Sequence, residues 1–139
     1  LYNESINYSE DVDFNIRSQA NFKFAYSDEA LVTYLRVSEN QITQSGLDGK
    51  NIPDYDFYEE KFIGRNDIKK YLDFQRYTKG KQYKLSGNKK NYSKLIAKID
   101  NKNLTTKQII LLKSPRMLLQ LLSNFKILLQ KMGFEVNSY

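Results

Sequence analysis

Residues 104–133 read LTTKQIILLKSPRMLLQLLSNFKILLQKMG, and this stretch carries the strongest structural signals in the chain. Its apolar run Ile109–Leu112 has the length of a strand and stops at Ser114-Pro115, residue types that suit the N-cap and first turn of a helix. Gly133 stands where a C′ glycine would end that helix. Between them, apolar residues recur at helical spacing: Leu118, Leu121, Leu122, Phe125, Leu128, Leu129 and Met132. We therefore expect a strand and then a helix whose apolar stripe faces the core, with a cofactor or partner-helix role for the stripe as the less favoured alternative.

The elements before this stretch are expected to alternate as well. Leu31–Val37 is rich in β-branched and aromatic residues and predicts a strand over residues 30–38. Alternating aromatic residues over 22–26 suggest an extra strand or an extended arm, and breakers predict a loop over 40–54. A helical region is expected over 56–77, with Gly64 as a weak point or as the divide between two helices.

The remaining segments complete an alternating order. Thr78-Lys79-Gly80 is expected to end the helical region, and residues 82–85 then predict a strand. Residues 88–104, rich in Lys and Asn, predict a projection that is either one or two helical turns or part of an extended hairpin. Phe134–Val136 predicts a short closing strand. This order indicates an α+β sandwich, in which two helices cover one face of a mostly antiparallel sheet.

Residue usage excludes several classes of function. The chain has no Cys and no His, so disulfides and cysteine-based zinc sites are ruled out, and the commonest metal ligand and general base are missing. We therefore expect no enzyme activity, no cofactor, no metal site and no small-molecule substrate. The longest apolar runs fall far short of the ~20 residues of a membrane-spanning helix, so we expect no membrane partner.

Charge is divided unequally along the chain. Residues 1–60 carry 4 basic and 12 acidic side chains, whereas residues 61–139 carry 18 and 4. Residues 76–116 hold 12 basic side chains and one acid, Asp100. Such a segment repels itself unless it meets a polyanion, and neutralising phosphates releases counterions. Nucleic acid is therefore the expected partner of the basic segment.

Tyrosines are interleaved with the lysines of this segment. Tyr77, Tyr83 and Tyr92 would offer stacking surfaces among the charges, as RNA-binding segments often do. The alternative is a solvated lysine-rich face with the tyrosines packed on the core. The length suits one domain, and we expect residues 29–139 to be a single α+β RNA-binding domain with a basic arm at about 87–105. Residues 1–28 are expected to be an acidic N-terminal extension, solvated over residues 1–20, with docking on a basic neighbour as the alternative.

The residues around 104–116 resemble a known family. Leu104–Lys107, the apolar run and Lys113–Arg116 are similar to the turn, strand and Arg-Ser-Pro-His signature of the small-subunit ribosomal protein family numbered ten, especially its divergent mitochondrial members. The sequence departs from that pattern at Thr105, which replaces a proline, and at Arg116, which replaces a histidine. Residues 88–103 look like an insertion, and residues 1–28 have no counterpart.

The resemblance implies a ferredoxin-like fold with a long basic hairpin in the head of the small ribosomal subunit. The expected partners are then ribosomal RNA and neighbouring small-subunit proteins, and the expected location is the mitochondrial matrix, with the cytoplasm of an AT-rich bacterium as the alternative. The expected RNA contacts combine the charged segment with the residues that match the family: Lys79, Lys81, Lys84, Lys89, Lys90, Lys94, Lys98, Lys102, Thr106, Lys107, Lys113, Ser114 and Arg116.

Two other functions stay open at this point. Tyr34–Ser38 resembles the nucleophile motif of serine recombinases, although the expected helix over 118–132 offers only two lysines in place of that family's arginine cluster. A polo-box-like protein-binding module would use the exposed edge of the expected strand at 81–86 to accept a peptide.

Overall fold

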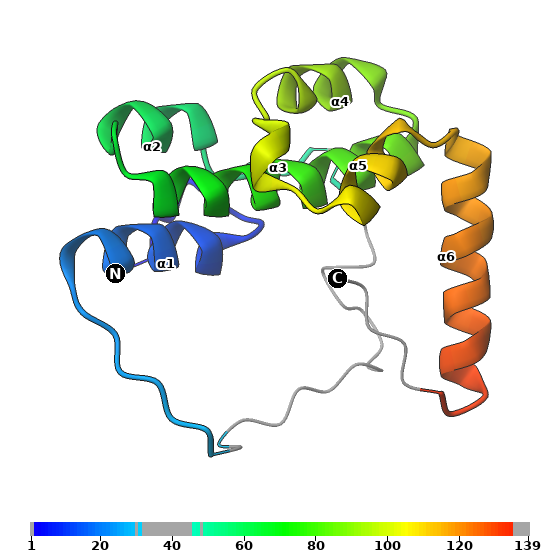
Figure 1. The fold of residues 1–139 in the computed structure, drawn as a ribbon, viewed down its shortest axis with the longest axis horizontal. Helices are drawn as coiled ribbons and strands as arrows, with labels where there is room; N and C mark the ends of the chain where they lie inside the picture. The colour runs from blue at the N-terminus through cyan, green and yellow to red at the C-terminus, as the bar shows by residue number, and fades with distance from the viewer. Residues whose placement is uncertain (1, 30, 32–45, 48, 135–139) are drawn as a thin grey trace. The chain divides into compact units, whose positions relative to one another are not determined.

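The structure, a computed structural model, describes residues 2–29, 31, 46–47 and 49–134 (Figure 1). Within these residues it contains α-helices and one 3-10 turn, and no strand. The elements are α1 (Glu10–Asn21), α2 (Tyr55–Lys61), α3 (Asn66–Ser86), α4 (Lys89–Ile96), η2 (Asn101–Asn103), α5 (Thr106–Lys113) and α6 (Arg116–Lys131). The predicted α+β sandwich, and the ferredoxin-like sheet with it, is therefore wrong for the described chain. The helices belong to two compact units, residues 1–69 and 70–139.

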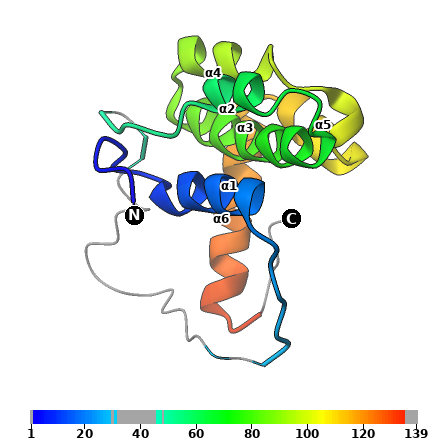
Figure 2. The same ribbon diagram turned by 90° about the vertical axis from the view of Figure 1, so that its left-hand side faces the viewer.

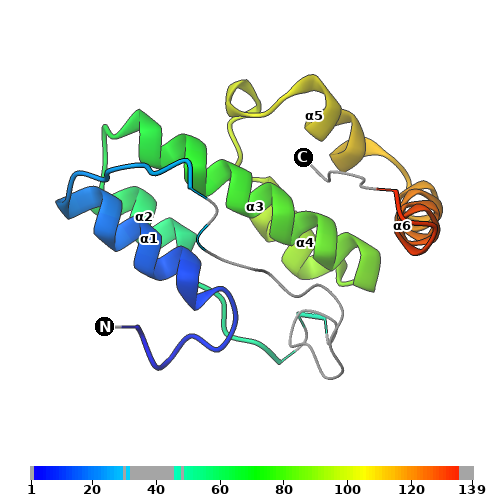
Figure 3. The same cartoon turned by 90° about the horizontal axis from the view of Figure 1, so that it is seen from below.

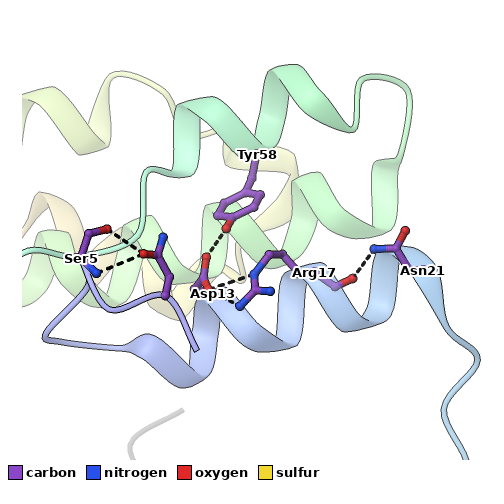
Figure 4. A network of polar contacts seen from close by, with 6 residues as sticks. Ser5, Asp13, Arg17, Asn21 and Tyr58 are labelled. Atoms are coloured by element: carbon purple, nitrogen blue, oxygen red, sulfur yellow. Dashed lines mark hydrogen bonds and ion pairs between the residues drawn. The ribbon is translucent and has the colours of Figure 1, made fainter. Parts of the chain in front are cut away.

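The first unit is held by a buried carboxylate on α1. Asp13 is fully buried, and its Oδ2 accepts hydrogen bonds from Nε and Nη2 of Arg17 at 3.0 and 2.8 Å (Figure 4). The hydroxyl of Tyr58 on α2 donates to the other oxygen, Oδ1. This hydrogen bond joins α1 to α2 (Figure 4). The prediction that residues 1–20 are solvated is thus wrong at Asp13, because a buried carboxylate needs partners and finds them on two helices.

The predicted division of the helical region at Gly64 is confirmed. α2 begins at an N-cap, Asp54, whose side chain accepts from the amides of Asp56 and Phe57, both at 3.1 Å. Gly64 has φ +84°, a conformation that L side chains rarely adopt, so it ends the first helical stretch before α3 begins.

α3 continues through the predicted stop at Thr78-Lys79-Gly80, so the predicted strand at 82–85 is wrong. Thr78 Oγ1 donates to the carbonyl of Phe74 at 3.0 Å, a bond within the helix. A Cβ built on Gly80 would lie 2.7 Å from Cδ1 of Ile96, so the glycine allows α4 to approach α3 closely (Figure 3). The helix stops instead at Gly87, where φ is +85°.

The predicted strand at 109–112 is also wrong, because these residues lie in α5. The Thr105 side chain accepts from the amide of Gln108, and the Gln108 side chain accepts from the amide of Thr105 at 2.9 Å. This reciprocal capping box satisfies two amides at the start of the helix. The apolar run therefore coils and places Leu112 in the core.

The predicted basic hairpin arm at 87–105 is wrong, and the helical alternative for this segment is found. The Asn88 side chain caps α4 by accepting from the amide of Asn91 at 3.1 Å. The core of the second unit forms between α3, α4 and α5. It consists of Tyr77, Leu104 and Leu112, with Phe74, Tyr92, Ile96, Ile99 and Ile109 packed around them.

The predicted helix after Pro115 is confirmed as α6, and Gly133 has the expected positive φ of +86°. Ser114 is not its N-cap: the Ser114 hydroxyl donates to the carbonyl of Ile110 at 2.7 Å, and α6 begins at Arg116. The prediction that the apolar stripe faces the core is wrong. α6 starts beside α5 and extends away from α3, α4 and α5 (Figures 1 and 2).

Several predicted elements lie wholly or mostly outside the described residues. These are the strand at 30–38, much of the loop at 40–54 and the closing strand at 134–136. Residues 22–29 are described; they contain no helix or strand and are exposed.

Candidate nucleic-acid interface

Five exposed lysines, which we call the lysine segment, follow one another on α4 and the turn after it. They are Lys89, Lys90, Lys94, Lys98 and Lys102. α4 turns its other side, with Tyr92 and Ile96, onto the core of the second unit. Thr106, Lys107, Lys113 and Arg116 are exposed as well. These nine predicted contact residues therefore remain accessible to a ligand.

Four predicted contact residues are taken up by the fold. Lys79 is buried, and Ser114 is buried with its hydroxyl bonded inside α5. The Nζ of Lys84 donates a hydrogen bond to the carbonyl oxygen of Leu112. The pKa of Lys81 is lowered by burial, and more weakly by the nearby charges of Lys126 and Lys107.

The predicted stacking role is wrong for two of the three tyrosines. Tyr77 and Tyr83 are only 3% and 6% exposed, so they pack in the interior as the alternative expected. Burial also raises the pKa of Tyr77. Tyr92 is half-buried and sits at the edge of a cavity.

This cavity of about 350 Å³, here called the Arg116 pocket, lies between the end of α3, the start of α4 and the start of α6. Its lining consists of Lys84, Gly87, Lys89, Tyr92, Ser93 and Arg116. Three of these side chains are cations, two carry hydroxyls and none is acidic. The cations and the Ser93 hydroxyl suit a phosphate group, whose oxygens accept hydrogen bonds from such groups.

Helix C-termini hold two of the pocket cations in place. Lys84 Nζ bonds the last turn of α5, where Tyr92 Oη also donates to the Leu112 carbonyl at 2.8 Å. Arg116 Nε donates to the carbonyl of Leu85, in the last turn of α3, at 3.0 Å. Cations are favoured at these ends because unpaired carbonyls point there. The guanidinium lies against Gly87, where an added Cβ would be 2.8 Å from Nη1.

A buried ion pair stabilises the helix that carries these groups. Arg76 and Asp73 are both fully buried, with Nη1 of Arg76 3.2 Å from Oδ1 of Asp73. The second oxygen of Asp73 accepts from the amide of Asp100 and from Nδ2 of Asn103, at 3.2 and 2.8 Å. Asp73 thus ties the segment after α4 to α3.

The chain matches no protein-family model, no curated protein and no solved structure. The resemblance to the ribosomal family therefore stays a prediction, and the fold that it implied is not found. None of the helices that the structure describes is long and apolar enough to cross a membrane. The same residues contain no cluster of three acidic side chains that would hold a metal ion.

Sequence reasoning missed two members of the pocket, Gly87 and Ser93. Gly87 carries a readable signal, since a glycine followed by Asn and two lysines is typical of a helix end followed by a new helix start. Ser93 has no such signal, because only the packing of α4 brings it to the cavity.

The larger cavity of the first unit, about 480 Å³, offers less to a ligand. Its lining includes Asp13 and Tyr58, whose polar atoms are already bonded to each other (Figure 4). The structure places no predicted contact residue there.

Proposed function

We propose that residues 70–134 form a non-catalytic RNA-binding module. The observation that carries the proposal is the charge of the folded unit: residues 70–134 contain 15 basic side chains and two acids, Asp73 and Asp100. Two carboxylates leave most of that charge uncompensated, so the unit is stabilised when a polyanion binds it. The exposed lysine segment gives the polyanion an accessible surface.

The kind of side chain favours contacts with the nucleic-acid backbone. Lysine is a flexible point charge that neutralises phosphates, whereas sequence readout needs side chains with fixed hydrogen-bonding geometry. The half-exposed ring of Tyr92 lies beside these lysines, which suits a single strand whose bases are free to stack. The Arg116 pocket has room for one phosphate and part of its nucleotide.

The test is RNA binding as a function of salt. The full chain and a Lys90→Gln/Lys94→Gln/Lys98→Gln variant are titrated with a fluorescent single-stranded RNA. A duplex DNA of equal length serves as competitor. Losing three phosphate contacts should reduce the slope of log affinity against log salt by about 2, since each contact contributes roughly 0.7 for single strands. The control Lys23→Gln/Lys61→Gln removes exposed lysines of the first unit and should bind as the unmodified chain does. Equal slopes for both variants, or stronger binding to duplex DNA, would contradict the proposal.

The pocket has its own matched pair of variants. Lys89 lines the Arg116 pocket, whereas its neighbour Lys90 does not. Lys89→Gln and Lys90→Gln remove the same charge from the same turn, so a specific phosphate seat predicts a larger loss of affinity for Lys89→Gln. Equal losses of RNA affinity would indicate that RNA binds a diffuse electrostatic surface and that the pocket is not part of the interface.

The small ribosomal subunit remains the specific setting suggested by the resemblance. Sedimentation of cell extract through a high-salt sucrose gradient tests it: co-migration with the small subunit supports that setting, and migration as a free protein removes it. Of the rivals, the polo-box-like module loses its predicted edge strand, because residues 81–86 lie in α3. Ser38 of the recombinase-like motif lies outside the described residues.

A further inference from the structure

The apolar side of α6 is exposed to solvent. Successive residues of a helix are 100° apart, so the apolar stripe predicted from the sequence forms one broad side of α6. Six of its side chains are between 45% and 64% exposed: Leu118, Leu121, Leu122, Phe125, Leu128 and Met132. An amphipathic helix of a soluble protein normally turns this side to the core. The exposed apolar side of α6 is therefore a candidate interaction surface.

α6 packs on its own unit through its other side. Leu119, which is only 5% exposed, and the half-buried Lys126 lie away from the centre of the apolar stripe. Lys126 and Lys107 each lie near enough to Lys81 to disfavour the charge on Lys81. A cationic cluster thus lies alongside the helix whose apolar side is exposed.

The charges on and near α6 indicate which kind of partner binds its apolar side. Residues 101–134 contain six basic side chains and no acid. On the helix, the exposed Lys131 lies beyond one edge of the apolar side, where a lysine stem can lie along an apolar surface while its ammonium reaches lipid phosphates. A second copy of the chain would bring two acid-free helices together. The apolar side also covers about 120° of the helix circumference, which is broader than the narrow a/d seam of a coiled coil.

We propose that α6 is an interfacial helix that lies on anionic phospholipid surfaces, with Phe125 and its apolar neighbours in the acyl boundary and the exposed Lys131 at the headgroups. This surface is distinct from the lysine segment that we propose for RNA. Binding of this kind needs no helix that crosses the bilayer.

The absence of tryptophan from the chain allows a direct test. Phe125→Trp places a fluorescent reporter at the centre of the apolar side, and Ile127→Trp places one on the opposite side of the same helix, where Ile127 is 48% exposed. The full-length variants are mixed with vesicles of phosphatidylcholine alone or with phosphatidylglycerol. We expect the indole emission of Phe125→Trp to shift to shorter wavelength only with anionic vesicles, and that of Ile127→Trp to stay unchanged. In co-sedimentation, Leu121→Ser should weaken binding to anionic vesicles by about tenfold.

Three outcomes would overturn the proposal. One is no emission shift of Phe125→Trp with any vesicle. Another is equal binding to neutral and anionic vesicles, which would remove the role of the lysines. The third is a short-wavelength emission of Phe125→Trp before any lipid is added, together with a dimer in analytical ultracentrifugation, which would show that a second copy covers the apolar side. The Lys90→Gln/Lys94→Gln/Lys98→Gln variant should bind vesicles as the unmodified chain does, so failure of the RNA proposal is recognised separately.

Discussion

At the scale of single residues, the buried carboxylates carry stability. Asp73 neutralises the buried Arg76 and accepts two further hydrogen bonds from the segment after α4. Asp73→Asn removes the charge and leaves the guanidinium buried, which should lower the free energy of unfolding by about 3–5 kcal/mol. Urea unfolding followed by circular dichroism measures this loss.

Asp67→Asn is the matched control on the same helix. The Asp67 carboxylate bonds Arg65 at the surface, and that bond lowers its pKa to about 2. Because both groups are exposed, losing the pair should change stability little. A similar loss in both variants would show that the burial of Asp73 is not what makes it important.

Tyr58 predicts a pH dependence at the alkaline end. Burial and the hydrogen bond to Asp13 raise the pKa of Tyr58 to about 12, above the value of about 10 in an unfolded chain. The folded state thus favours the neutral phenol, so its contribution is complete below pH 10 and is lost as the pH rises through 12.

The Tyr58→Phe variant checks this sign. Between pH 10 and 12 the unfolding free energy of the unmodified chain should fall more steeply than that of Tyr58→Phe, measured by urea titration at each pH. Tyr2→Phe, at an exposed position, should keep the steeper fall. Parallel curves for the unmodified chain and Tyr58→Phe would argue against a coupled Tyr58–Asp13 bridge.

At the scale of elements, the caps decide where the helices begin. Thr105→Ala removes one half of the capping box of α5 and should cost about 1 kcal/mol of stability. The neighbouring Thr106 is exposed and its side chain makes no capping bond in the box, so Thr106→Ala serves as the control and should change little. Thermal unfolding of both variants checks the difference, and equal losses would contradict the capping role.

Gly87 and Gly64 form a second matched pair. Both have φ near +85°, and an alanine at either position should cost about 1–3 kcal/mol in backbone strain. Only at Gly87 does the new Cβ meet the Arg116 guanidinium; at Gly64 nothing lies within 4 Å. Gly87→Ala should therefore also weaken RNA binding, whereas Gly64→Ala should lose stability alone. Equal RNA affinities for the two variants would exclude Arg116 from the interface.

At the scale of the whole molecule, the two units carry opposite charges. Residues 1–69 have 7 basic and 13 acidic side chains, whereas residues 70–139 have 15 and 3. Self-repulsion within the second unit should lower its stability at low ionic strength, where screening is weak. We expect the thermal midpoint to rise between 10 and about 300 mM sodium chloride, and to rise less in the Lys90→Gln/Lys94→Gln/Lys98→Gln variant. A midpoint that falls with salt would show that attractive charge pairs prevail.

The features that were predictable from the amino-acid sequence follow from local physical chemistry. Helical periodicity and Gly133 predicted α6, and Gly64 predicted the break before α3, because the backbone conformation of a few residues decides both. The unequal division of charge along the chain is likewise read directly from the order of the residues. The capping box Thr105–Gln108 was readable too, and would have indicated a helix in place of the strand at 109–112.

Which side chains are buried depends on long-range packing between helices. Gly80 is a helix breaker in isolation, yet α3 continues through it because α4 packs closely there. Lys79 and Lys84 resemble their lysine neighbours in sequence, but one is buried and the other bonds the end of α5. The apolar side of α6 looks like a core face and is exposed instead. Burial depends on which distant surfaces meet, and that pairing of surfaces is absent from any local pattern of residues.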